Sequence, residues 1–126
     1  MDNSIRIGEG KVTITENVIG NIAIIAAEEI EGVSKITKNV TATITDIFSK
    51  TKQAQGVKVE STEGDVVIEI SLELVYGSMI EEVSRKVQSN IKLNVESMTG
   101  LNVREVNVIV TGLAVNKNAL DKKINS

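Results

Sequence analysis

The chain has 126 residues and 13.6 kDa, the length of a single domain, with 25% charged residues, 41% residues of the hydrophobic set and a formal net charge of −3. This composition is typical of a soluble globular protein, and its acidic balance gives no electrostatic reason to bind polyanions. The sequence contains no His and no Cys, which excludes imidazole and thiolate catalysis, disulfides and ordinary zinc or haem sites. We therefore expect no enzyme activity, no cofactor, no ordinary metal site and no small-molecule substrate. The rival enzyme hypothesis would need Lys, Glu, Ser and Tyr alone to act in a pocket.

The apolar segments are too short to cross a membrane. The longest unbroken apolar run, from Ile22 to Ala27, ends at Glu28 and Glu29, whereas a spanning helix needs about 20 predominantly apolar residues. The N-terminus also lacks an apolar stretch of signal-peptide length. The sequence therefore predicts a cytoplasmic protein without direct membrane insertion, which associates with a membrane only through a partner.

The N-terminal part of the chain predicts a strand followed by a long helix. Apolar and polar residues alternate over 11–14, as in a strand. A helix is predicted over roughly 16–31, between Thr15 as N-cap and Gly32 as stop signal. Apolar residues recur there at helical spacing and predict a buried stripe of Ile19, Ile22, Ala23, Ala26 and Ile30.

The middle of the chain predicts mainly strands. Residues 33–37 are a candidate strand, 39–48 a candidate short helix and 50–55 an exposed loop. A β-hairpin is predicted over 57–76, with Gly64 in its turn. Period-two alternation in its second strand predicts a buried face of Val66, Ile68, Ile70, Leu72, Leu74 and Tyr76.

A second amphipathic helix is predicted between Ser78 and Gly100. Ser78 and Glu81 have the spacing of a capping box, and Gly100 is placed to end the helix as a left-handed cap. The predicted buried stripe is Ile80, Val83, Val87, Ile91, Val95 and Met98. The outer side carries two i,i+4 ion pairs, Glu81 with Arg85 and Glu82 with Lys86.

These elements predict the fold class. With a last strand over 106–112, the chain is expected to be α/β (α+β), a two-layer sandwich in which a mixed β-sheet carries two long helices on one face. The predicted organisation is a flexible N-terminus (1–9), a single α/β domain (10–113) and a polar C-terminal tail (114–126).

The sheet face turned away from the helices is the predicted interaction surface. Three apolar side chains interrupt its polar side chains, and the residues concerned are Val67, Glu69, Glu73, Val75, Asn107 and Ile109. The same face was assigned Lys11, Thr13, Lys58, Glu60, Ser71, Glu105 and Thr111. Such a surface, together with unpaired sheet edges, suits self-association or partner docking. Plain exposure of scattered aliphatic residues is the alternative.

An acidic cluster at the end of the first helix is a second candidate surface. Glu28, Glu29 and Glu31 lie where the helix dipole disfavours negative charge. A docking site for a basic partner, a weak Ca²⁺ or Mg²⁺ site and a solvated helix end are all compatible with this pattern.

Two short motifs match catalytic signatures only in part. Ser49–Lys52 and Ser89–Lys92 have the Ser-x-x-Lys spacing, but the accompanying Ser-Asp-Asn and Lys-Thr-Gly elements are missing. Gly8–Lys11 lacks the full Gly-x-x-x-x-Gly-Lys pattern of a phosphate loop and precedes a strand instead of a helix. Solvated surface and turn residues are the simpler interpretation.

A small α/β RNA-binding module is the alternative function. Its basic area would consist of Lys35, Lys38, Lys50, Lys52 and Lys58. Such modules stack bases on strand aromatics or hold the backbone with a Gly-x-x-Gly loop, and the sequence has neither arrangement. Nucleic-acid binding is therefore not the favoured interpretation.

Several segments together resemble one bacterial family. In chain order they are 10–14 (Gly-Lys-Val-Thr-Ile), 17–19, 22–23, 26–27, 31–33 (Glu-Gly-Val), 56–59 (Gly-Val-Lys-Val), 76–77 (Tyr-Gly), 87–88, 98–101 (Met-Thr-Gly-Leu) and 106–108 (Val-Asn-Val). In this order and spacing they resemble the alkaline shock protein family, the envelope-stress proteins found mainly in Gram-positive bacteria. The resemblance covers residues 10–113.

The resemblance implies a non-enzymatic cytoplasmic protein of cell-envelope homeostasis. Members of the family are linked to tolerance of alkaline stress and, in some branches, to fatty-acid metabolism genes. Some self-associate and are held at the membrane by a separate anchoring protein. The implied partners are other copies of the chain and a membrane-anchoring or metabolic protein.

Overall fold

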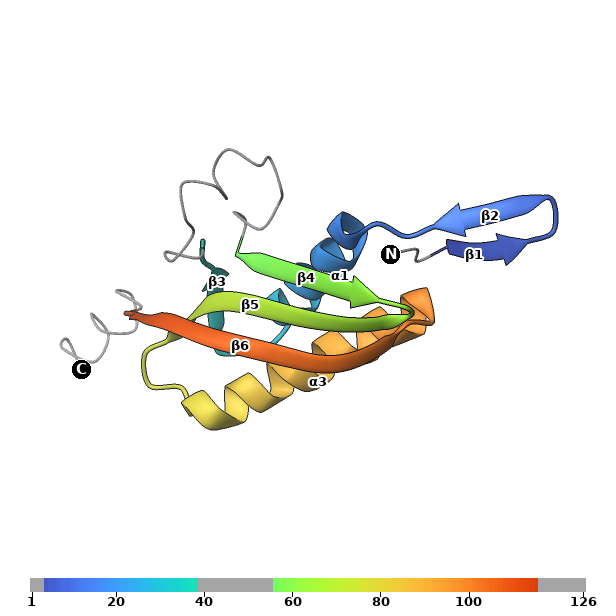
Figure 1. Ribbon diagram of the computed structural model, residues 1–126. Coiled ribbons are helices and arrows are strands. Elements are labelled where there is room, and N and C mark those ends of the chain that lie inside the picture. The colour runs from blue at the N-terminus through green and yellow to red at the C-terminus, as the bar shows by residue number, and fades with distance from the viewer. Residues whose placement is uncertain (1–3, 39–55, 116–126) are drawn as a thin grey trace, which may run out of the picture.

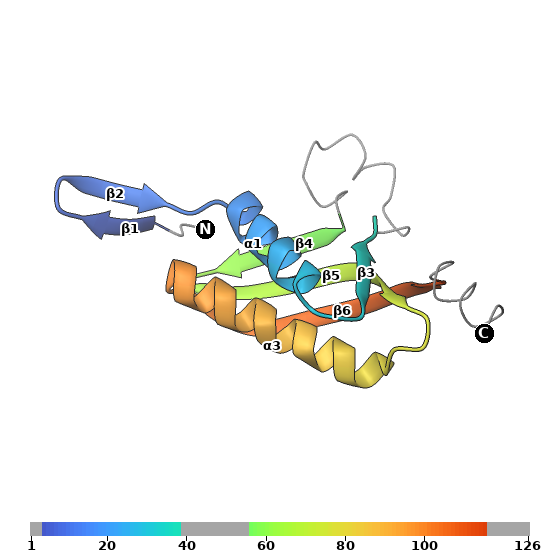
Figure 2. The ribbon, with the colours of Figure 1, turned by 180° about the vertical axis from the view of Figure 1, so that it is seen from behind.

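The computed structural model describes residues 4–38 and 56–115, in which both helices cover one face of a mixed β-sheet (Figure 1). The elements in chain order are β1 (Ser4–Ile7), β2 (Gly10–Thr13), α1 (Glu16–Glu28), β3 (Val33–Ile36), β4 (Val57–Thr62), β5 (Asp65–Val75), α3 (Ile80–Thr99) and β6 (Asn102–Ala114). The view from behind shows α1 and α3 side by side in front of the sheet (Figure 2). The predicted two-layer α/β class with both helices on one face is confirmed.

Strand β5 is the centre of the main sheet. It pairs in parallel with β6 along one edge, and in antiparallel fashion with β4 and then β3 along the other edge. The two partners on that edge meet at Ser71. Its backbone N–H donates to the carbonyl of Gly56 (2.8 Å), and its carbonyl accepts from the N–H of Thr37 (2.9 Å). Strands β3 and β4 therefore follow one another along the same edge of β5.

The predicted β4–β5 hairpin is confirmed, and its turn has two residues. Thr62 pairs with Asp65 across the turn. Glu63 and Gly64 both have positive φ values, 47° and 87°, as in the type I′ turns that match the twist of paired strands.

The core lies between the sheet and the helices and follows the alternation of β5. Its five helix-facing side chains, Val66, Ile68, Ile70, Leu72 and Leu74, are fully buried. Tyr76 is 68% exposed, so its predicted place in this row is wrong. The alternation of the sequence continues through Tyr76, but the strand ends at Val75 and the chain turns there.

Helix α1 packs closely on β4 because its inner side is made of small residues. A methyl group added at Gly20 would lie 3.1 Å from Cγ1 of Val57, and Ala23, Ala26 and Ala27 are buried beside it. The helix ends at Glu28 with Glu29 as its C-cap, a few residues before the predicted end.

The predicted N-cap of α1 is confirmed, and it provides a stability test. The Thr15 hydroxyl accepts a hydrogen bond from the N–H of Val18 (3.4 Å). Replacing Thr15 with Ala removes this side-chain acceptor, leaving the Val18 N–H with the Thr15 carbonyl alone (3.1 Å), and is expected to lower the free energy of unfolding by about 1 kcal/mol. Urea unfolding followed by circular dichroism measures the change. Thr15→Ser keeps the hydroxyl and is expected to retain most of the stability; an equal loss in both variants would contradict the cap.

Helix α3 follows the predicted stripe except at its two ends. Val83, Val87, Ile91 and Val95 are buried, whereas the ends of the predicted stripe, Ile80 and Met98, are 48% and 68% exposed. Both ion pairs on the outer side are confirmed: Lys86 Nζ lies 3.5 Å from Glu82 Oε1, and Arg85 pairs with Glu81.

The caps of α3 confirm one sequence prediction and correct the other. Gly100 ends the helix in the left-handed conformation, with φ of 74°. At the other end the N-cap is Met79, without a side-chain hydrogen bond. The predicted Ser78–Glu81 capping box is therefore wrong, because the helix begins one residue too late for the Ser78 hydroxyl to reach the first turn.

The N-terminal strands form a hairpin of their own. Among the described residues, β1 and β2 pair with each other as a separate two-stranded sheet, and this hairpin extends away from the main sheet (Figure 1). The sequence did not predict β1. Lys11 and Thr13 lie on this hairpin, so their assignment to the face of the main sheet that is turned away from the helices is wrong.

The last strand is longer than predicted. Strand β6 runs over 13 residues and includes the predicted segment 106–112. The candidate short helix at 39–48 and the loop at 50–55 lie outside the described residues.

Candidate interaction surface

The side of the main sheet that faces away from α1 and α3 carries most of the predicted interaction residues. We call this side the open face; on it lie the odd-numbered residues of β5 and the neighbouring side chains of β4 and β6. Val67, Glu69, Glu73 and Val75 of β5 are half-buried there. They alternate with the buried row that faces the helices, so the period of the strand places them together.

Parallel pairing brings β6 residues beside those of β5. Asn107 lies opposite Glu69, and Ile109 opposite Ser71. Ile109 is 39% exposed. The structure therefore joins six of the predicted interaction residues on two neighbouring strands, although about forty residues of sequence separate the two groups.

Ser71 is a polar residue in the middle of the open face. It is only 3% exposed, and β3, β4 and β6 all meet beside it. On the same face the hydroxyls of Thr37 and Thr111 lie 2.8 Å apart, and Thr111 also donates to the carbonyl of Leu72 (3.2 Å). These side-chain hydrogen bonds tie the end of β3 to β6 across the central strand.

The acidic cluster belongs to the other layer. Glu28 is the last residue of α1, Glu29 is its C-cap, and both are exposed, as is Glu31. They lie at the end of a helix that covers the opposite face of the sheet, so the predicted interaction residues form two separate surfaces.

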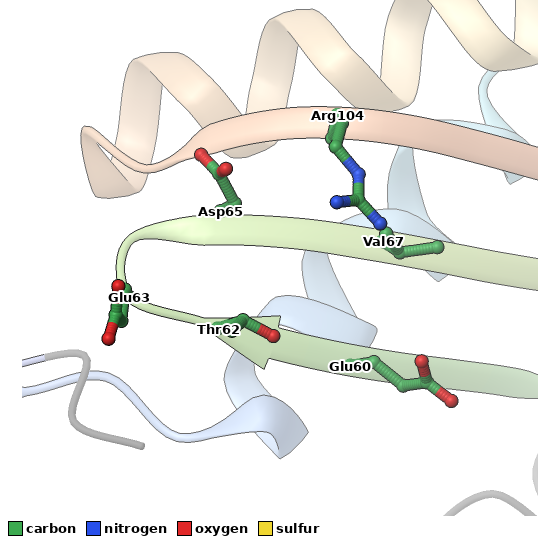
Figure 3. Close-up of a pocket in the computed structure, with 6 residues that line it drawn as sticks. All are labelled: Glu60, Thr62, Glu63, Asp65, Val67 and Arg104. Atoms are coloured by element: carbon green, nitrogen blue, oxygen red, sulfur yellow. The ribbon is translucent and has the colours of Figure 1, made fainter.

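A shallow hollow of about 220 Å³ lies at the β4–β5 turn end of the open face (Figure 3). Glu60, Thr62, Glu63, Asp65, Val67 and Arg104 line it. The Arg104 side chain extends from β6 toward Val67, with carboxylates around the rim (Figure 3). A hollow with three carboxylates and one guanidinium suits charged side chains of a binding partner.

Arg104 was not recognised from the sequence as part of this surface. It is the extra residue of a β-bulge, since Val66 pairs with Val103 and Val67 with Glu105. A bulge re-aims a side chain without any regular pattern along the strand. The remaining lining residues come from the hairpin. The sequence placed Glu60 and Val67 on this face, whereas for Thr62, Glu63 and Asp65 it gave the turn signal of Gly64 alone.

The other sequence candidates are spread over the molecule. Ser89 and Lys92 are exposed on α3, and Gly8 lies in the turn between β1 and β2. Lys58 Nζ lies 3.4 Å from Glu60 Oε1, and both residues belong to β4. Ser49, Lys50 and Lys52 are outside the described residues.

Over 4–38 and 56–115, no three His, Cys, Asp or Glu side chains are grouped so that they could hold a metal ion. Among these same residues, neither helix combines the length and the apolar character needed to cross a lipid bilayer.

The fold and the surface define a class: a small α+β domain whose sheet is covered by helices on one side and open on the other. The sequence comparison then assigns the family. A family model described as the ASP23 family, with a cell envelope-related function, matches residues 4–115. The chain belongs to this family, the alkaline shock protein family.

The relatives agree with this assignment. The chain is 32% identical over 115 residues to YqhY of Bacillus subtilis, covering 91% of this chain and 85% of that protein. It is also 32% identical over 117 residues to YloU of the same organism, covering 91% of this chain and 98% of YloU. A stress response regulator gls24 homolog of Streptococcus pyogenes is 27% identical over 105 residues, which are 82% of this chain but 59% of that protein. The family resemblance seen in the sequence is confirmed.

The fold alone is also shared with more distant proteins. A copper form of a MamM CTD variant superposes with a TM-score of 0.50 at 10% sequence identity, covering 79% of this chain and all of that chain. At this identity the similarity concerns the arrangement of helices and strands only.

Proposed function

We propose that the protein is a non-catalytic interaction protein of the cell-envelope stress response. It self-associates, and through its open face it binds a membrane-anchoring or metabolic partner. The family has a cell envelope-related function, and one relative is named a stress response regulator. In this proposal the protein is cytoplasmic and reaches the membrane through the partner.

One observation carries the proposal: the helices cover only one side of the sheet. Both α1 and α3 lie on the same face (Figures 1 and 2), and the described residues include no element that covers the other. Val67, Val75 and Ile109 lie there between carboxylates and amides. A surface with apolar side chains among charged ones provides burial for a partner and polar groups that select it.

The charges of the open face indicate the character of the partner surface. Among the described residues, five carboxylates outnumber three cationic groups on the strands of this face: Glu60, Asp65, Glu69, Glu73 and Glu105 against Lys35, Lys58 and Arg104. A partner with basic side chains around an apolar centre would be complementary, and the electrostatic part of the binding is expected to weaken with salt.

Substitutions on the open face test the proposal. Val67→Lys and Ile109→Lys place a charge among the apolar side chains and are expected to reduce the recovery of partners in a pull-down from the native organism. Leu93→Lys is the matched control, because Leu93 is 66% exposed on α3 in the other layer. A set of partners unchanged by both open-face substitutions would exclude this face as the binding surface.

A further inference from the structure

The two outer edges of the main sheet differ in how they are protected. Strand β4, at one edge, is six residues long and bears Lys58 and Glu60. Helix α1 also contacts this strand, where the N–H of Ser61 donates to Glu16 Oε2 (3.1 Å). Strand β6 is 13 residues long, and among the described residues it pairs with β5 alone. Near the start of β6 the N–H of Val103 donates to Glu96 Oε2 of α3 (2.9 Å). Beyond that point, and in the part of the chain that the structure describes, no other strand pairs with the outer edge of β6.

The hydrogen-bond pattern shows which groups of β6 point outward. Both backbone groups of Ser71 bond toward β3 and β4. Since backbone groups alternate between the two edges of a strand, Ile70 and Leu72 bond toward β6, and their partners there are Asn107 and Ile109. The N–H and C=O groups of Val106, Val108 and Val110 therefore point away from the sheet.

This outward row lacks the features that normally discourage pairing. Exposed edges are usually blunted by charged residues, proline or short length. Residues 106–114 contain no charge and no proline. The register with β5 is regular from Glu105 to Val110, between two bulges. Among the described residues, the side-chain bond to the outward row comes from Gln88, whose Nε2 donates to the carbonyl of Val106 (3.0 Å).

We propose that β6 pairs antiparallel with β6 of a second copy of this chain, about a two-fold axis at Val108. In this register Val108 lies opposite itself, Val106 opposite Val110, and Asn107 opposite Ile109. Glu105 lies opposite Thr111, so no like charges face each other, whereas parallel self-pairing in register would oppose Arg104 to Arg104.

A second copy of this chain is the binding partner that matches the β6 edge. In this register the outward N–H and C=O groups of each valine bond to those of a valine in the second copy. Dimer formation therefore pairs the outward groups of both copies at once. An isologous contact of this kind closes as a dimer and leaves no further β6 edge. The inference rests on the self-association in the proposed function, and it assigns that contact to the β6 edge while the open face remains available to other partners.

Val108→Pro tests the edge directly. Proline is tolerated on an edge strand where the N–H faces outward, but it removes the donor at the two-fold axis and places its ring in the path of the partner strand. The dissociation constant of the dimer, measured by sedimentation, is expected to rise about tenfold or more, with the circular dichroism spectrum unchanged. A folded variant with an unchanged dimer, or a natural chain that is monomeric at millimolar concentration, would overturn the proposal.

Disulfide formation tests the register independently of any folding defect in Val108→Pro. The chain has no cysteine, so introduced thiols report on one contact. Residues opposite each other in a non-hydrogen-bonded antiparallel pair have Cα atoms about 4.5 Å apart, within disulfide range. A mixture of Asn107→Cys and Ile109→Cys chains is expected to form the mixed disulfide under mild oxidation. Asn107→Cys mixed with Lys58→Cys is the control, and equal cross-linking in both mixtures would overturn the register.

The edge and the open face give separable results. Val67 lies on β5, one strand away from the edge. Loss of partner binding in Val67→Lys with an intact mixed disulfide would support both proposals. The opposite result is loss of the dimer in Val67→Lys, with the dimer unchanged in Val108→Pro and no mixed disulfide. That result would overturn the β6-edge proposal and would leave the open-face proposal standing.

Discussion

Replacing Gly56 with Ala is expected to destabilise the domain severely. Gly56 has φ of 91°, and a Cβ atom there would lie 2.2 Å from the carbonyl oxygen of Thr37. The methyl group would force apart the end of β3 and the start of β4 at Ser71. The strained φ and the displaced backbone together are expected to lower the free energy of unfolding by roughly 3 kcal/mol.

A second glycine provides the matched control for this substitution. Gly64 has a similar φ of 87°, but nothing lies within 4 Å of the position where its Cβ would be. Gly64→Ala carries the conformational strain alone and is expected to cost about 1 kcal/mol. Urea unfolding of both variants separates the two effects; equal losses would show that the close approach to Thr37 does not matter.

Leu72→Ala is expected to have the second large effect. Leu72 is fully buried and lies on the central strand between Ile36 of β3 and Val110 of β6. Truncation removes apolar contacts and leaves a cavity that rigid neighbours on both sides cannot fill, at a cost of about 3 kcal/mol.

The comparison residue for Leu72 is on the same strand but on the other side. Val75→Ala removes apolar atoms from a half-buried side chain on the open face and is expected to cost less than about 1 kcal/mol. Thermal unfolding of both variants measures the difference. A loss in Val75→Ala as large as that in Leu72→Ala would contradict the placement of the core on the helix side.

Patterns with a regular period were readable from the sequence. The alternation of β5 and the helical spacing in α1 and α3 come from burial of one side of each element, and burial acts on every second residue or every third and fourth. The predicted helices, the β4–β5 hairpin and the two-layer arrangement depended on these periods.

Features set by contacts distant in sequence were not readable. Nothing local in residues 11–14 indicates that β2 pairs with β1 instead of joining the main sheet. Arg104 enters the hollow through a bulge, which interrupts the period. Tyr76 continues the alternation of β5 in sequence, but the chain has already turned.

The candidate surface was predictable in part for the same reason. The open-face residues of β5 follow from its alternation, whereas the partners beside them depend on the parallel register with β6. The outward direction of the backbone groups of Val106, Val108 and Val110 follows from the hydrogen bonds of Ser71 to β3 and β4. These pairings between distant segments are not visible in a single sequence.

The meeting of β3 and β4 beside one residue has a consequence for how the family can diversify. The chain departs from β5 at Thr37 and rejoins it at Gly56, both held by the backbone of Ser71. Lengthening a connection whose ends are already fixed costs little, about 0.6 kcal/mol for a doubling of its length. Relatives can therefore gain or lose residues between these two points while the strands on either side keep their register.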